Sequence, residues 1–328
     1  MKNILLLLLA SLLVFSCSKD DEDDNNNQQV DPPPEHVWEK IANFPGAKRE
    51  EATAFSINGY GYVGLGIQNF VDTYKDFYKY DPIQDNWTKL NDFPGSARYG
   101  AASFVINGEA YVGLGYDEYG YTLKDLWKYT PTNDSWVQVA SYPEYDEGYS
   151  TNFTLESKGF VLFNEDSTLW AYNPSTDSWS EKQGFPLSEF YKPSCFTLNS
   201  KAYIATGRRS NPTKKVYEYD PVADSWTQKS DFEGGKRSEA VGFALDGFGF
   251  VGAGIAEGYM QFYSDMWSYN QTHDKWFKME DFPMTNPFNL ESFVIEDTAY
   301  IGGGYQGHAT GSDYNKKYYK FHRKVISN

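Results

Sequence analysis

Basic residues, histidine and cysteine are all scarce in this 328-residue sequence. It has 29 Lys and Arg against 45 Asp and Glu, so its net charge is −16. That charge argues against nucleic acid or an anionic membrane surface as a partner. The four histidines have no zinc-ligand spacing, and neither a nucleophile elbow nor a phosphate loop occurs. We therefore expect no metal and no other cofactor.

Helical periodicity is also missing. Beyond the N-terminus, no stretch repeats apolar residues at positions i, i+3, i+4 and i+7 for three turns. Aromatic residues instead make up 18 % of the chain, and glycine occurs 28 times. Short strands joined by tight turns have this composition, so the chain is expected to be all-β.

Residues 1–16 have the features of a signal peptide. Lys2 supplies a positive start, and the apolar run 4–15 is too short to cross a bilayer as a permanent helix. Residues 14–17, Val-Phe-Ser-Cys, resemble a bacterial lipobox, in which the signal is cleaved before the cysteine and the cysteine is acylated. The resemblance implies that Cys17 carries two or three acyl chains, enough for stable anchoring.

An acidic segment and a polar tether follow Cys17. Residues 18–24, Ser-Lys-Asp-Asp-Glu-Asp-Asp, resemble the export tag that sends lipoproteins of Bacteroidota to the outer face of the outer membrane. A merely solvated run of charge is the alternative. Residues 25–34 are rich in Asn, Gln and Pro, so we expect a disordered tether over 17–36. Because the lipid uses Cys17, only Cys195 remains and no disulfide is expected.

From residue 37 onward the sequence is built from a repeat. Tryptophans recur at intervals of 43 to 50 residues, namely Trp38, Trp87, Trp136, Trp179, Trp226 and Trp276. A phenylalanine follows each tryptophan by 17 positions, and a second aromatic residue follows that phenylalanine by seven. Five of the tryptophans are preceded by a tyrosine seven positions earlier, and Phe321 takes the tyrosine's place in the last unit. A fixed internal period predicts one supersecondary unit used repeatedly.

Each unit has signals for four strands, a to d. Strand a carries the phenylalanine, and a pair such as Asn58-Gly59 suits the two-residue hairpin to strand b. Strand b runs into glycines, strand c carries the tyrosine, and strand d opens with the tryptophan. This order resembles the Kelch repeat over residues 38–321, although most units have Gly-x-Gly rather than adjacent glycines. The resemblance implies a six-bladed Kelch β-propeller over 37–328, with four antiparallel strands in each blade.

Counting strands predicts how the ring closes. The last unit supplies strands a, b and c but ends without a tryptophan strand. Residues 38–45 read as a d strand with no a, b or c strand before it. Pairing the two would complete the sixth blade, so that no blade is left half-built and the edges that could template aggregation are protected.

One face of the propeller is expected to hold the ligand site. The d-to-a and b-to-c connections emerge on the same face, and the b-to-c interval alone varies, from 12 to 21 residues. Six residues before each strand a phenylalanine stand Arg49, Arg98, Glu147, Phe190, Arg237 and Pro287. Two residues after these stand Glu51, Gly100, Tyr149, Lys192, Glu239 and Asn289. The arginines could bind carboxylate or vicinal hydroxyls, or could instead pair with Glu51 and Glu239 to tie blades together.

These residues lead to two hypotheses of function. The predicted ligand-binding residues are Arg49, Arg98, Glu147, Arg237, Tyr116, Arg208, Tyr259 and His308. The first hypothesis is a monomeric lipoprotein, exposed on the cell surface, that binds an extracellular glycan or protein without catalysis. The alternative follows from a resemblance to bacterial sialic acid mutarotases. It implies catalytic roles for Arg49, Arg98, Arg237, Glu51 and Glu239.

Copper chemistry is the remaining possibility that the Kelch resemblance raises. Galactose oxidase has a Kelch propeller, and its site needs two histidines and a cysteine crosslinked to a tyrosine. Of the four histidines here, His36, His273 and His322 fall in the tether, a c-to-d turn and the C-terminus. Only His308 falls on the expected ligand face, so copper is not expected.

Overall fold

The computed structural model describes residues 32–144, 148–188, 190–256, 261–308 and 311–325, and all of its regular structure is β. Residues Pro32–Asn328 form one compact unit. The expected signal peptide, Cys17 and most of the tether lie outside the described residues. Within those residues there is no helix that could cross a membrane.

The described strands form six four-stranded antiparallel sheets, which we number in chain order of their first inner strand. Sheet 1 contains β2 (Thr53–Ile57), β3 (Tyr60–Gly64), β6 (Phe77–Asp81) and β7 (Asn86–Lys89). Sheet 2 contains β8 (Ala102–Ile106), β9 (Glu109–Gly113), β10 (Leu126–Thr130) and β11 (Ser135–Val139). Sheet 3 contains β12 (Ser150–Leu155), β13 (Lys158–Phe163), β14 (Leu169–Asn173) and β15 (Ser178–Lys182).

The other three sheets repeat this order. Sheet 4 contains β16 (Ser194–Leu198), β17 (Lys201–Ala205), β18 (Val216–Asp220) and β19 (Ser225–Gln228). Sheet 5 contains β20 (Val241–Leu245), β21 (Phe248–Gly252), β22 (Met266–Asn270) and β23 (Lys275–Lys278). Sheet 6 contains β25 (Glu291–Ile295), β26 (Thr298–Gly302), β29 (Tyr318–Arg323) and β1 (His36–Lys40). Short strands in the loops add β4 (Ile67–Gln68), β5 (Asp72–Thr73), β24 (Pro287–Phe288), β27 (Tyr305–His308) and β28 (Gly311–Tyr314).

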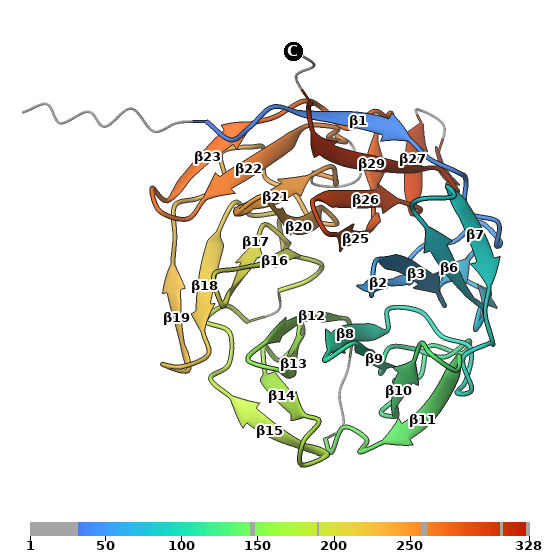
Figure 1. The fold of residues 1–328 in the computed structure, drawn as a ribbon. Helices are drawn as coiled ribbons and strands as arrows, with labels where there is room; N and C mark the ends of the chain where they lie inside the picture. The colour runs from blue at the N-terminus through green and yellow to red at the C-terminus, as the bar shows by residue number, and fades with distance from the viewer. Residues whose placement is uncertain (1–31, 145–147, 189, 257–260, 309–310, 326–328) are drawn as a thin grey trace, which may run out of the picture. The chain divides into compact units, whose positions relative to one another are not determined.

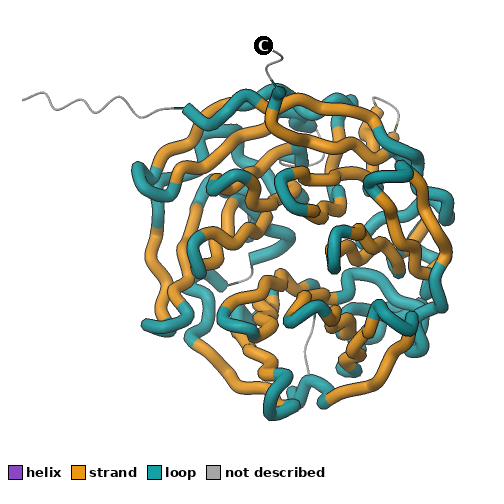
Figure 2. Tube along the Cα trace, viewed as in Figure 1, coloured by secondary structure: helices purple, strands orange, loops and turns teal. Residues whose placement is uncertain are grey.

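The six sheets stand around a common axis, and the inner strand of each sheet lies at the centre (Figure 1). These inner strands contact one another in the cyclic order β2, β8, β12, β16, β20, β25 and back to β2. Viewed along the axis, strands and connecting loops alternate around the whole circle (Figure 2). The arrangement confirms the all-β prediction and is compatible with a propeller.

Sheet 6 is assembled from both ends of the chain. β1 pairs antiparallel with β29, so that His36 lies opposite Arg323 and Lys40 opposite Tyr319. The N-terminal segment therefore pairs with the last strand, as the strand count predicted. The strand itself runs from residue 36 to residue 40 rather than from 38 to 45, and His36, which we assigned to the tether, is buried within it.

The repeated phenylalanine and the aromatic residue seven positions later are cross-strand neighbours. In sheet 1, Phe55 on β2 lies opposite Tyr62 on β3, and their rings stack at 5.2 Å. All six equivalent pairs are stacked, with interplanar angles of 6° to 14°. A two-residue turn with positive φ at both residues, such as Asn58 and Gly59, sets this register. The constant spacing of seven is thus set by the hairpin register and the ring stacking within each sheet.

An aspartate in the turn between strands c and d joins five of the sheets to the sheet before them. Asp85, Asp134, Asp177, Asp224 and Asp274 each accept a hydrogen bond from the strand c tyrosine hydroxyl at 2.6–2.9 Å. Each also accepts a backbone N–H from the segment that leaves the preceding sheet, at 2.8–3.1 Å. These bonds fix neighbouring sheets together at the outer edge of the ring.

The junction between sheets 5 and 6 uses a different contact. Sheet 6 has Phe321 where the other sheets have the tyrosine, so this hydroxyl is missing. There, His36 stacks on Phe321 at 4.7 Å, and its Nε2 lies 3.0 Å from the carboxylate of Asp246 in sheet 5. The first residue of β1 therefore takes over the role of the tyrosine and aspartate at the seam.

Deleting residues 36–46 should abolish cooperative unfolding, because sheet 6 would lose its outer strand and the junction with sheet 5 would lose His36. Urea unfolding followed by tryptophan fluorescence measures this. Deleting the equally long segment 21–31, which precedes the compact unit, is the control and should leave the midpoint unchanged. An equally sharp transition in both deletion variants would show that β1 is not needed for closure.

Candidate functional site

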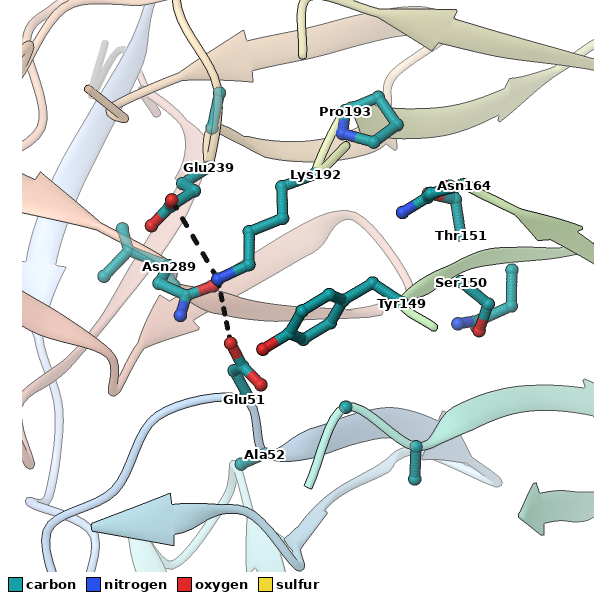
Figure 3. Close-up of a pocket in the computed structure, with 15 residues that line it drawn as sticks. Glu51, Ala52, Tyr149, Ser150, Thr151, Asn164, Lys192, Pro193, Glu239 and Asn289 are labelled. Atoms are coloured by element: carbon teal, nitrogen blue, oxygen red, sulfur yellow. Dashed lines mark hydrogen bonds and ion pairs between the residues drawn. The ribbon is translucent and has the colours of Figure 1, made fainter. Parts of the chain in front are cut away.

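Six equivalent loop positions converge on one cavity at the centre of the ring. Its volume is about 230 Å³. Every one of the residues found two positions after the arginine position lines it, namely Glu51, Gly100, Tyr149, Lys192, Glu239 and Asn289. Each comes from the loop that enters the inner strand of its sheet. The expected ligand face therefore does contain a cavity, and one position of the repeat supplies a residue to it from all six sheets (Figure 3).

The backbone at these positions is unusual. Glu51, Gly100, Lys192, Glu239 and Asn289 all have φ between 46° and 62°. This left-handed conformation is uncommon for residues other than glycine and costs about 1–3 kcal/mol at a strained site. It is held by hydrogen bonds of 3.0 Å from Gly100 N to Glu51 O, from Glu239 N to Lys192 O, and from Asn289 N to Glu239 O. Neighbouring loops therefore brace one another around the cavity.

Lys192 is the cation at the centre of the site. Its Nζ lies 2.8 Å from Oε1 of Glu51 and 3.9 Å from Oε1 of Glu239, between the two carboxylates (Figure 3). It also lies 4.9 Å from the centre of the Tyr149 ring. Burial acts to lower the pKa of Lys192, but Glu51 and Glu239 outweigh it and raise the pKa above its usual range. Lys192 is therefore an ammonium at neutral pH and a weak proton donor.

Glu51 has one oxygen without a hydrogen-bond partner. Its side chain is only 8 % exposed, and Oε1 is paired with Lys192. Oε2 is buried, and none of the described residues donates a hydrogen bond to it. A buried carboxylate oxygen left in this way costs about 1–3 kcal/mol or more, so such atoms are rare outside sites that take a ligand or water.

Two further carboxyl groups lie next to the cavity. Glu50 accepts hydrogen bonds from the Tyr305 hydroxyl at 2.7 Å and from Nδ2 of Asn289 at 2.8 Å. Burial, and then the charge of Glu51, raise the pKa of Glu50 to about 7. Glu291 accepts the N–H of Ala52 at 3.2 Å, and burial raises its pKa to about 8. Sequence reasoning missed both, because nothing in their local sequence shows that they are buried.

The three arginines do not reach the cavity. Arg49, Arg98 and Arg237 are at most 2 % exposed. Their guanidinium groups make paired hydrogen bonds of 2.5–3.0 Å to Asp76, Asp125 and Asp265. Each also donates to the carbonyl at the end of strand b in the same sheet, that of Leu65, Leu114 or Ala253. The expectation that they stand on the rim, or that they pair with Glu51 and Glu239, is corrected by this geometry.

A signal for these pairs is present in the sequence. In the three units that have the arginine, an aspartate directly precedes strand c. In the other three units that position holds Thr168, Lys215 and Lys317. Arginine and aspartate therefore occur together, unit by unit. Each pair ties the loop that enters strand a to the loop that enters strand c, and so holds the cavity-lining loops in place.

The other predicted ligand-binding residues are distributed differently. Glu147 and Tyr259 lie outside the described residues, and of His308 only the backbone in β27 is described. Arg208 bridges the backbones of Tyr191 and Pro212 and does not line the cavity.

Tyr116 does not line the cavity itself but contacts Tyr149, which does. Its ring stacks on Tyr99 at 5.3 Å and tilts against the cavity-lining Tyr149 at 5.2 Å. These three tyrosines form a continuous aromatic wall from the cavity into the loops of sheet 2. Within the described part of the chain, no group of three or more His, Cys, Asp or Glu side chains is arranged to hold a metal ion.

Comparison with known proteins supports the fold. No family model matches the chain, and no curated protein matches it. Among solved structures, one described as "Structure of YjhT" superposes with a TM-score of 0.70 at 19 % sequence identity. The superposition covers 84 % of this chain and 95 % of that one. At this identity the similarity concerns the fold alone, and it supports a β-propeller.

If the arginine–aspartate pairs are structural, removing one partner should lower the free energy of unfolding more than replacing both partners by apolar residues. Asp125→Ala leaves Arg98 buried and unpaired, so we expect a loss of about 3–5 kcal/mol in the free energy of unfolding. The double variant Arg98→Met, Asp125→Leu removes both charges and should lie much closer to the native value. Urea unfolding compares the two, and equal losses would contradict the assignment.

Proposed function

We propose that this chain is a six-bladed Kelch-type β-propeller that is anchored through lipid on Cys17, faces the cell exterior, and binds an extracellular carbohydrate. The observation that carries the proposal is the central cavity, where the same repeat position of every sheet contributes a residue and where a buried carboxylate oxygen of Glu51 has no partner among the described residues.

The groups around the cavity suit a polyhydroxylated ligand. Lys192 and the amide of Asn289 can donate hydrogen bonds to hydroxyls, and Glu51 and Glu239 can accept them. The ring of Tyr149 offers a surface for the C–H face of a sugar. The volume of about 230 Å³ is below the roughly 300–1,000 Å³ typical of pockets for drug-sized ligands. A single sugar unit at the end or branch of a glycan is therefore the fitting size.

The blade count and Kelch type rest on sequence and topology together. Six tryptophan units and six four-stranded sheets agree in number among the described residues. The sheet made from β1 and the last three strands then counts as the sixth blade. The lipid anchor and surface location rest on residues 14–24, where the lipobox-like and acidic segments lie. A protein ligand instead of a glycan would use the exposed loop residues Phe70, Tyr119 and Tyr121.

A sugar mutarotase is the second candidate. Opening a cyclic sugar needs one group that takes a proton and another that gives one. Glu51 could take the proton, and Lys192 or Tyr149 could give it, since all three line the cavity. However, the pKa of Lys192 and that of Tyr149 are both raised, by Glu51 and Glu239 for the lysine and first by burial for the tyrosine. Both are therefore poor proton donors at neutral pH, so neither suits the role of the acid in such a reaction.

Binding can be tested with the mature chain, residues 17–328, carrying Cys17→Ser to keep it free of lipid. We expect it to bind members of a glycan array, and Lys192→Met to weaken that binding at least about tenfold, as loss of a charged hydrogen bond does. Tyr149→Phe, which preserves the fold more closely, should weaken it less. Lys201→Met is the control, because Lys201 pairs with Glu218 at 3.1 Å and does not line the cavity.

The same samples separate the two candidates. Nuclear magnetic resonance measures whether the protein speeds the exchange of anomers in any sugar that it binds. No acceleration agrees with a binding protein, and acceleration that Glu51→Gln removes would establish the enzyme. Failure to bind any glycan would contradict the carbohydrate proposal.

Anchoring can be tested on cells that make the full-length chain. The native protein should partition into the membrane fraction and be digested by protease added to intact cells. Cys17→Ser should release it from the membrane fraction, whereas Cys195→Ser should not. A Cys17→Ser protein that stays in the membrane would contradict lipid anchoring.

A further inference from the structure

The charge around the cavity is unbalanced. Among the described residues that line it, Lys192 is the only cation, against the carboxylates of Glu51 and Glu239. Glu50 and Glu291 add two carboxyl groups beside it. The nearest guanidinium groups are unavailable, because Arg49, Arg98 and Arg237 are each neutralised by an aspartate. A ligand in the cavity therefore meets more negative charge than positive charge.

Oε2 of Glu51 determines which ligand group would form the strongest hydrogen bond in the cavity. Oε1 already takes the Lys192 ammonium at 2.8 Å, whereas Oε2 has no donor among the described residues. An ionised carboxylate can only accept hydrogen bonds. The strongest donor that it can receive is another charged one, because such bonds are about twice as strong as neutral ones. A ligand hydroxyl would satisfy the atom, but it would leave the charge imbalance in place.

We propose that the cavity selects a sugar that carries a protonated amine, which donates to Oε2 of Glu51, over the corresponding neutral sugar, and that it disfavours sugar acids. This inference rests on the carbohydrate-binding function proposed above and specifies its ligand. A sugar carboxylate would instead lie beside Glu51 and Glu239 with no free guanidinium to pair with it.

The neighbouring carboxyl groups support this choice. Burial, reinforced by the charge of Glu51, raises the pKa of Glu50 to about 7, and burial raises that of Glu291 to about 8. The contribution of Glu51 to the Glu50 shift means that a second negative charge beside Glu51 is unfavourable. A bound ammonium would offset the cost of ionising these carboxyl groups, whereas a bound carboxylate would increase it. Lys192 and Asn289 remain able to donate to the hydroxyls of the same sugar ring.

A matched ligand series tests the proposal by calorimetry on the mature chain carrying Cys17→Ser, at a pH where the sugar amine is protonated. The series is glucosamine, glucose, N-acetylglucosamine and glucuronate, repeated with the four galactose counterparts. We expect the amino sugar of one series to bind about 10- to 100-fold more tightly than its neutral parent, the range given by hydrogen bonds to charged groups. The N-acetyl sugar should bind like the parent, and the acid most weakly.

Two variants connect the preference to Glu51. Glu51→Gln keeps the shape of the side chain but removes its charge, so it should abolish the difference in affinity between the amino sugar and the neutral sugar. Glu109→Gln is the control. Glu109 pairs with Lys128 at 3.1 Å and does not line the cavity, so this variant should leave all affinities unchanged. A preference that survives Glu51→Gln would overturn the assignment.

The outcomes distinguish this inference from the function that it rests on. If no sugar in the series and no glycan binds, the carbohydrate proposal itself fails. If sugars bind but the neutral or acidic member is preferred, only the amine selectivity fails. Nα-acetyl-lysine amide serves as an amine without a sugar ring, and binding as tight as that of the amino sugar would overturn recognition of an amino sugar.

Discussion

The pairing of β1 with β29 is the constraint on which the rest of the molecule depends. Without residues 36–40, sheet 6 would have only three strands, and β29 would lose its outer partner. Backbone pairing between residues 279 to 287 positions apart in the chain thus turns a row of sheets into a ring. His36 adds a side-chain contact across the same seam, where the tyrosine and aspartate of the other junctions are absent. A closed ring then defines a central axis, and the axis is where the candidate site lies.

Closure also explains why the cavity is polar. Six loops converge at the axis, and their backbones must bend back into the inner strands there. Three of the left-handed residues at this bend, Gly100, Glu239 and Asn289, donate their N–H groups to the carbonyls of neighbouring loops, and the residues at these positions line the cavity. Three buried arginine–aspartate pairs connect these loops to the loops that enter strand c. The arginines are therefore part of the support for the site, while the residues two positions later, such as Lys192 and Glu51, form its surface.

Burial gives the cavity its chemical character. Lys192 remains charged because two carboxylates surround it, and Tyr149 covers one side. Glu50 and Glu291 are partly or largely neutral at pH 7 because burial disfavours their ionised forms. The result is a site with many hydrogen-bonding groups and more ionised carboxylates than cations among the residues that line it.

The repeat, the four strands in each unit, the hairpin turns and the pairing of the two chain ends were all readable from the sequence, because spacing reflects local packing that every unit must satisfy. The position two residues after the arginine was also visible as a set. Sequence reasoning misplaced the arginines, because the choice between a rim and a buried ion pair depends on whether Asp76, Asp125 and Asp265 lie within reach, about 27 residues away. It missed Glu50 and Glu291 for the same reason. Spacing along the chain determines which residues are equivalent, but only the closed ring decides which are buried, which are paired, and which oxygen of Glu51 has no partner among the described residues.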